Sequence, residues 1–179
     1  MPAQYQQDSV RGARIPAVQT PTVPDLIKVP AGEKLVLVAH ATGFQIYVCR
    51  LDAANNPAWV LKAPEAQLFY QASPDQGNAD EQGSYIGKHF GGPTWQHKDG
   101  SEITGSMAAK VDAPEAGAIP WLLVNVTDHS GSGVFSEITT IQRVNTEGGL
   151  PPASNCTASN VGAESKSSYT ADYYFYAKS

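Results

Sequence analysis

The residues best suited to chemistry in this sequence are two histidines on either side of a tryptophan, followed by two carboxylates. His89 and His97 flank Trp95, and Asp99 and Glu102 come a few residues later. Imidazole and carboxylate groups are common ligands of divalent metals, so this segment is a candidate metal site. The alternative is structural: His89 bonds backbone groups beneath a loop, and His97 pairs with Glu102 across a hairpin.

Other residue types give weaker signals for catalysis. His40 alternates with two valines, which predicts a hydrogen-bonded position in a sheet. No serine stands in the Gly-x-Ser-x-Gly turn of α/β hydrolases. No strand leads through Gly-x-Gly-x-x-Gly into a helix, which argues against a nicotinamide cofactor and an NAD-dependent dehydrogenase. We therefore expect no cofactor, with a divalent metal at His89 and His97 as the alternative.

The aromatic residues indicate a different function, the binding of a ligand or partner. The chain has 8 Tyr, 3 Trp and 5 Phe, which make up 9% of its residues. Tyr47, Tyr85 and Trp95 are candidates for an exposed aromatic surface of the kind that binds sugars and other ligands with apolar faces. The alternative is that these rings fill a β-sheet core, because aromatic residues favour strands.

The charge of the chain excludes several partners. Lys and Arg total 12 against 17 Asp and Glu, which gives a net charge of −5. An acidic chain without a run of basic residues is poorly suited to nucleic acid. No apolar stretch approaches the roughly 18 residues of a membrane-spanning helix. We expect neither a nucleic-acid partner nor a membrane span.

Short apolar runs separated by Gly, Pro and polar residues predict an all-β fold. Residues 34–41 and 44–49 predict two strands joined by a turn at Gly43, and residues 26–29 predict a shorter strand. One helical turn could lie within residues 106–115. The pattern predicts a single-domain sandwich or closed barrel of about nine or ten short, mainly antiparallel strands.

The clearest local signal is a hairpin around Asp99-Gly100, which lies between two alternating runs. Asp-Gly favours a two-residue turn, because both central positions need a positive φ. In that register His97 faces Glu102, and Trp95 faces Thr104. The predicted hairpin therefore places Trp95 on the same face as His97 and Glu102.

The two ends of the chain differ in character. Residues 1–23 are polar, contain proline and show no period, which predicts a flexible arm before a β domain at residues 24–179. Residues 169–176 predict an aromatic terminal strand. Its residues on one face are Tyr169, Ala171, Tyr173 and Phe175. A separate arm and an aromatic edge suit self-assembly into a homo-oligomer or filament.

Cys49 and Cys156 are the two cysteines. An even number fits one disulfide, and two buried free thiols are the alternative. Few lysines and many small polar residues favour export to an oxidising compartment. The first residues contain no apolar segment of a signal peptide, so we expect that an export signal has been removed.

Several runs of sequence, taken together and in order, carry a family resemblance. They include GFQIYVC at 43–49, GKHFGGPTW at 87–95, IPWLL at 119–123, TEGG at 146–149 and YTADYYFY at 169–176. The chain resembles a family of secreted bacterial and fungal proteins known as domain of unknown function 3455.

That resemblance implies export, and it implies that Cys49 and Cys156 form a disulfide, because the family's cysteine pair stands at these positions. It carries over no catalytic or binding residue. Some fungal members are labelled malate dehydrogenase-like. We do not extend that label to this chain, which lacks the dinucleotide-binding turn.

These observations predict an exported, non-catalytic β domain that binds an extracellular ligand or assembles with itself. Its expected location is secreted, periplasmic or on the cell surface. The alternative is a metal-dependent secreted enzyme that uses His89, His97 and a nearby carboxylate.

Overall fold

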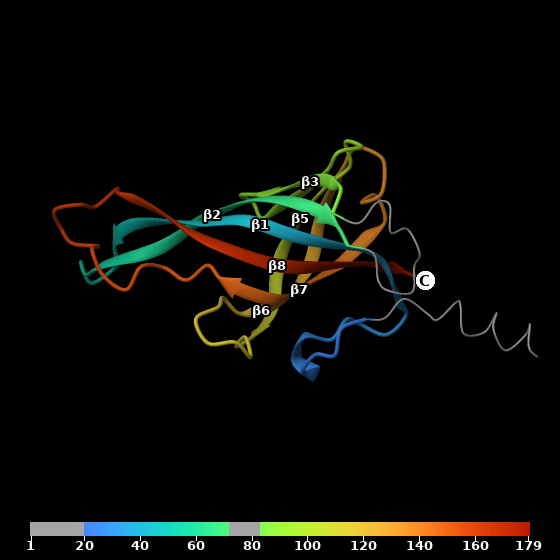
Figure 1. Ribbon diagram of the computed structural model, residues 1–179, viewed down its shortest axis with the longest axis horizontal. Coiled ribbons are helices and arrows are strands. Elements are labelled where there is room, and N and C mark those ends of the chain that lie inside the picture. The colour runs from blue at the N-terminus through green and yellow to red at the C-terminus, as the bar shows by residue number, and fades with distance from the viewer. Residues whose placement is uncertain (1–19, 72–82) are drawn as a thin grey trace, which may run out of the picture.

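The computed structural model describes residues 20–71 and 83–179, which form almost only β structure (Figure 1). A short 3-10 helix, η1 (Asp25–Ile27), precedes eight strands that pair in sequence order and close into a barrel through β1 and β8. No helix among the described residues is long and apolar enough to cross a membrane. The strands are β1 (Glu33–Leu51), β2 (Pro57–Tyr70), β3 (Tyr85–Phe90), β4 (Thr94–His97), β5 (Glu102–Val111), β6 (Trp121–Ser130), β7 (Ile138–Gly148) and β8 (Glu164–Lys178).

The all-β prediction is confirmed, and the closed barrel is the one of the two predicted architectures that forms. There are eight strands instead of nine or ten because some are longer than predicted. Residues 34–41 and 44–49 belong to the single strand β1, so Gly43 continues a strand instead of turning. A Cβ atom at Gly43 would stand 2.2 Å from the carbonyl oxygen of Glu65 on β2, so glycine is needed for this close approach.

Two local predictions were wrong. The region 26–29, predicted as a strand, begins within η1. There the side chain of Ile27 is fully buried, and its carbonyl accepts a hydrogen bond of 2.8 Å from Nε2 of Gln142 instead of from a strand. The helical turn expected within 106–115 is absent, because residues up to Val111 belong to β5 and pair with β6.

The predicted hairpin forms between β4 and β5, but its register differs by one residue. Trp95 pairs with Ile103 and not with Thr104, and Glu102 pairs with Gln96 and not with His97. Trp95 and Ile103 are both almost fully buried. The shift therefore pairs the tryptophan with a core residue in place of a polar one.

The cause of the shift is a loop of three residues, 98–100, in place of two. The loop is closed by a hydrogen bond from the N–H of His97 to the carbonyl of Ser101. Gly100 has a φ of +97°. The carboxylate of Asp99 accepts hydrogen bonds from both the backbone N–H and the hydroxyl of Ser101, which stabilises the wider loop.

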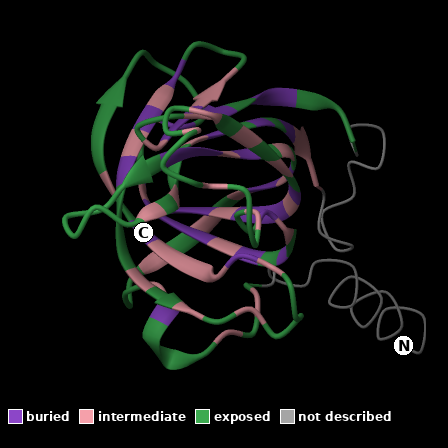
Figure 2. Cartoon of the chain, turned by 90° about the vertical axis from the view of Figure 1, so that its left-hand side faces the viewer, coloured by how far each residue is buried: buried purple, intermediate pink, exposed green. Residues whose placement is uncertain are grey.

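The interior of the barrel holds the core (Figure 2). Phe135 and Phe175 stack with ring centroids 4.7 Å apart, and Trp95 meets Tyr173 edge to face at 5.7 Å. The four residues predicted to share one face of the last strand are all buried in the core cluster. Each large ring moved out of water stabilises the fold by roughly 1.5–3 kcal/mol.

The strands β1, β2 and β8 continue beyond the barrel and form a long three-stranded extension (Figure 1). β1 and β2 remain paired as far as Leu51 and Pro57, whereas β3 pairs with β2 only over residues 66–69. Cys49 on this extension forms a disulfide with Cys156, which precedes β8. The single disulfide is therefore confirmed, and it links the three-stranded extension to the segment that leads into the last strand.

The segment before β1 lies against the outside of the barrel. Residues 20–23 line a shallow hollow together with Gln142 and Tyr176. The hydroxyl of Tyr176 donates to Oε1 of Gln142, whose amide in turn donates to Ile27. Most of the predicted arm, residues 1–19, lies outside the described residues.

Candidate functional site

His89 is a core residue. Its ring is buried and stacks on Trp95, with the two centroids 4.3 Å apart. Its Nδ1 lies 2.8 Å from the carbonyl oxygen of Thr94. Because a carbonyl only accepts, Nδ1 carries the proton. Burial lowers the pKa of His89 to about 3, so the ring is neutral near pH 7. This is the structural role weighed against the metal site.

Of the other candidate metal ligands, His97 and Asp99 lie together, whereas Glu102 has a different partner. His97 Nδ1 lies 3.2 Å from a carboxylate oxygen of Asp99, while Glu102 accepts a hydrogen bond of 2.9 Å from Gln96. Burial lowers the pKa of His97, and the Asp99 charge offsets part of that effect. The described residues contain no group of three His, Cys, Asp or Glu side chains that could hold a metal. The structure thus does not bring the four candidates together as a site.

Two of the three residues proposed for an exposed aromatic surface are inside the protein. Trp95 is 2% exposed, and Tyr47 is buried with its hydroxyl donating to the carbonyl of Gly149. Trp95 belongs to the core of the barrel, whereas Tyr47 is buried outside that core cluster. Tyr85 is 45% exposed and is the one of the three that can meet a ligand.

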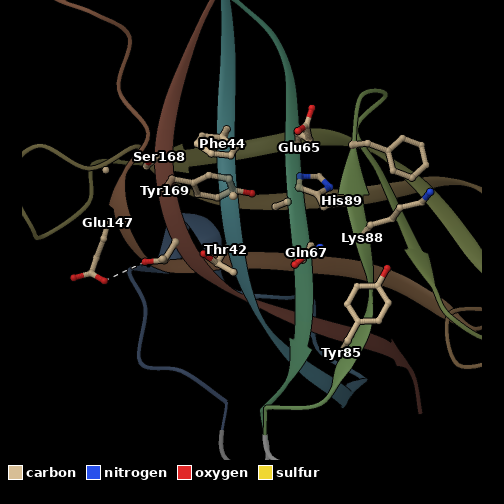
Figure 3. A pocket seen from close by; sticks show the side chains of 15 residues that line it. Thr42, Phe44, Glu65, Gln67, Tyr85, Lys88, His89, Glu147, Ser168 and Tyr169 are labelled. Carbon is tan, nitrogen blue, oxygen red and sulfur yellow. Dashed lines mark hydrogen bonds between the residues drawn. The ribbon is translucent and has the colours of Figure 1, made fainter.

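Tyr85 borders a groove of about 930 Å³ formed by β8, β1, β2 and β3 (Figure 3). The side chains that face outward alternate with core residues along each strand, as strand geometry requires. Thr42 and Phe44 project from β1 in this way, and Glu65 and Gln67 from β2. The groove therefore lies on the outer face of the sheet, on rigid strands and not on loops.

The groove combines an aromatic ring with charged groups. Phe44 is 36% exposed. The ammonium of Lys166 lies 5.4 Å from the centroid of that ring and 3.3 Å from Oε1 of Glu65. Lys88 from β3 also lines the groove, across from Phe44 in Figure 3. The surface thus offers an apolar face next to donors and acceptors of hydrogen bonds.

A second hollow of about 530 Å³ adjoins the groove, and Glu147 lines both. Here His40 and Asp172 face each other across β1 and β8, with Nδ1 of His40 2.8 Å from Oδ1 of Asp172. Nδ2 of Asn145 donates to the other carboxylate oxygen at 2.9 Å. Since a carboxylate only accepts, Nδ1 carries the proton. No described residue bonds Nε2, so this nitrogen is left to bond a ligand.

The polar side chains that line this hollow include an imidazole, an amide and three carboxylates. The described residues that line the hollow include neither serine nor cysteine. The hydroxyl of Thr146 is already used, since it donates to the carbonyl of Ile119 at 2.6 Å. A histidine with an oriented Nε2 can accept a hydrogen bond or take up a proton.

Sequence analysis placed His40 correctly as a hydrogen-bonded sheet residue but did not find its partner. Asp172 is 132 residues further along the chain. Only the pairing of the first strand with the last brings the two together. The available signal was the position of each residue on the outward-facing side of its strand.

Comparison with known proteins gives one positive result. A family described as a protein of unknown function, DUF3455, matches residues 30–177. No curated protein and no solved structure matches the chain significantly. The matched region includes the disulfide, the groove, the hollow around His40 and all eight strands except Lys178, the last residue of β8. The chain therefore belongs to the DUF3455 family, as its sequence motifs indicated.

Proposed function

We propose that this protein is a non-catalytic binding domain that acts outside the cytoplasm, and that the groove over β8, β1, β2 and β3 holds an oligosaccharide. The observation that carries the proposal is the composition of the groove. Phe44 and Tyr85 expose ring surface beside the hydroxyl of Thr42, the amide of Gln67 and the carboxylate of Glu65. Sugars bind to such surfaces, because each ring has an apolar face edged by hydroxyl groups.

The location outside the cytoplasm is supported by the covalent structure. Cys49 and Cys156 are joined, and the described part of the chain has no free cysteine. Disulfides of this structural kind persist mainly in oxidising compartments. A domain that meets a carbohydrate surface outside the cell is consistent with both features.

The other functions predicted from sequence have less support. His89 lines the groove but is only 3% exposed, and the described residues hold no group of three ligands that would support a metal-dependent reaction at His89 and His97. Self-assembly through the chain ends stays a prediction, because residues 1–19 of the arm lie outside the described part of the chain.

The test is calorimetric titration of the full chain with hexasaccharides of glucose, mannose and N-acetylglucosamine. Phe44→Ala and Tyr85→Ala each remove a ring from the groove, and we expect each to weaken binding about tenfold. Met107→Ala is the matched control, since Met107 is 55% exposed on β5, away from the groove. The proposal is overturned if no hexasaccharide binds, or if the groove variants bind as tightly as the control.

A further inference from the structure

The hollow around His40 lies next to the groove on the same outer face. Thr42 and His40 are two residues apart on β1, and Thr170 and Asp172 are their partners on β8. The hydroxyl of Thr170 donates to Glu147 at 3.0 Å, and Glu147 borders both hollows. A ligand longer than the groove would therefore reach His40.

We propose that this hollow is a second subsite of the groove, in which Nε2 of His40 accepts a hydrogen bond from a hydroxyl or amino group of the oligosaccharide. The inference rests on the proposed function of the groove. It makes His40 a residue that determines which ligands bind. It also implies a ligand long enough to span the groove and the hollow around His40.

The contacts of His40 differ from those of His89 and His129. His89 and His129 each bond a backbone carbonyl, at 2.8 Å from Thr94 and 2.7 Å from Ile138. His40 instead bonds a carboxylate that is 10% exposed, while its own side chain is 45% exposed. A buried carboxylate behind an exposed imidazole fixes both its tautomer and its orientation.

The carboxylate is itself held in place. Asn145 donates to the oxygen of Asp172 that His40 leaves free. Asn145 has a φ of +52°, an unfavourable conformation for most residues. Each oxygen of Asp172 thus has its own donor, and the imidazole is held with Nε2 free. Such second-layer hydrogen bonds are what keep a recognition group in one geometry.

The walls of the hollow favour a ligand that donates hydrogen bonds. Besides His40, the carboxylates of Glu115 and Glu147 line it, and no Lys or Arg is among its described lining residues. Trp121 supplies ring surface, and its buried Nε1–H is the one donor there without a partner among the described residues. Acceptors on the protein require donors on the ligand, and a protonated amine gives stronger hydrogen bonds than a hydroxyl. We therefore expect oligosaccharides of glucosamine to bind more tightly than those of glucose.

The test compares chain length and variants of the full protein by calorimetry, with glucosamine disaccharides and hexasaccharides as probes. His40→Ala should weaken hexasaccharide binding about tenfold and leave disaccharide binding unchanged, because the short ligand fills only the groove. Phe44→Ala should weaken both. His129→Ala is the control for loss of an exposed histidine.

A measurement on the unaltered chain keeps the test independent of the folding of the variants. In ¹⁵N spectra of labelled histidine, the Nε2 signal of His40 should shift when the hexasaccharide saturates the protein. The inference is overturned if that signal does not move, or if His40→Ala equals the control at both lengths while Phe44→Ala still weakens binding. If Phe44→Ala has no effect, the proposed function fails first.

Discussion

The inner and outer faces of the same strands use aromatic rings in opposite ways. On the inner face, rings pack against rings, as His89 does on Trp95, and as Phe175 does on Phe135 from the turn before β7. On the outer face, the ring of Phe44 meets the ammonium of Lys166 and solvent. The residue types overlap, so the type of side chain does not decide between core and binding surface. The side of the strand on which a ring projects decides it, except where another segment covers the outer face, as the segment before β1 covers Tyr176.

Two histidines show the same contrast. His89 is neutral and enclosed, and its one hydrogen bond goes to a backbone carbonyl. His40 is partly exposed and is oriented by Asp172 through Nδ1. The first contributes to stability, and the second has a nitrogen left for a ligand. The predictions below test how far this division between stability inside and recognition outside holds.

The largest effect is expected for a ring on the inner face. Trp95→Ala should lower the free energy of unfolding by about 3–5 kcal/mol, because it leaves a large cavity at the centre of the core. Nε1 of Trp95 has no hydrogen-bond partner among the described residues, so the loss is one of packing. Urea unfolding followed by circular dichroism measures it.

Phe44→Ala supplies the outer-face comparison for that measurement. We expect a loss of no more than about 1 kcal/mol, since the ring is 36% exposed and makes few contacts with the core. Equal losses for the two variants would show that the outer ring belongs to the core, and the comparison between faces would fail.

The sequence was enough to predict which side chains of one strand share a face. Tyr173 and Phe175 were assigned to the same face, and both are buried in the barrel. This succeeds because side-chain direction alternates with a period of two and needs no knowledge of the rest of the chain.

The register between strands could not be predicted in the same way. Asp99-Gly100 matches a two-residue turn, but the hydrogen bonds of Asp99 to Ser101 stabilise a loop one residue longer. That shift pairs Trp95 with Ile103 in place of Thr104. Local sequence gives the hairpin, whereas side-chain hydrogen bonds in the loop decide its register.

Contacts that depend on barrel closure were the hardest to predict from the sequence. His40 and Asp172 are each unremarkable in a local window of sequence. They become a pair because β1 and β8 are hydrogen-bonded neighbours, which is a property of the whole topology. The groove was found only in part, through Tyr85, for the same reason.

A second prediction concerns pH and the enclosed histidine. Burial lowers the pKa of His89 from 6.5 to about 3, so below pH 6.5 the unfolded chain binds a proton that the folded chain does not. The contribution to stability is thus present above pH 6.5 and is lost as the pH falls. Between pH 7 and about pH 4.5, the free energy of unfolding should drop by roughly 2–3 kcal/mol on account of this group.

His89→Phe tests the assignment, because it keeps a ring beside Trp95 but cannot titrate. The variant should lose less stability than the unaltered chain over the same pH range. His97, whose pKa burial also lowers, is present in both proteins and cancels in the comparison. An identical pH dependence for the two chains would show that His89 is not the group responsible.

The smallest effect is expected on the outer face, for Lys166→Ala. Lys166 lies over Phe44 and beside Glu65, but Lys166 and Glu65 are both more than half exposed. Exposed ion pairs and exposed cation–π contacts each contribute at most about 1 kcal/mol, and salt screens the ion pair further. The variant should therefore unfold within about 1 kcal/mol of the unaltered chain, and the difference should shrink in high salt. A loss as large as that of Trp95→Ala, unchanged by salt, would mean that Lys166 holds the sheet together. The outer face would then share the stabilising role of the core and could not be treated as a surface free to exchange its contacts for a ligand.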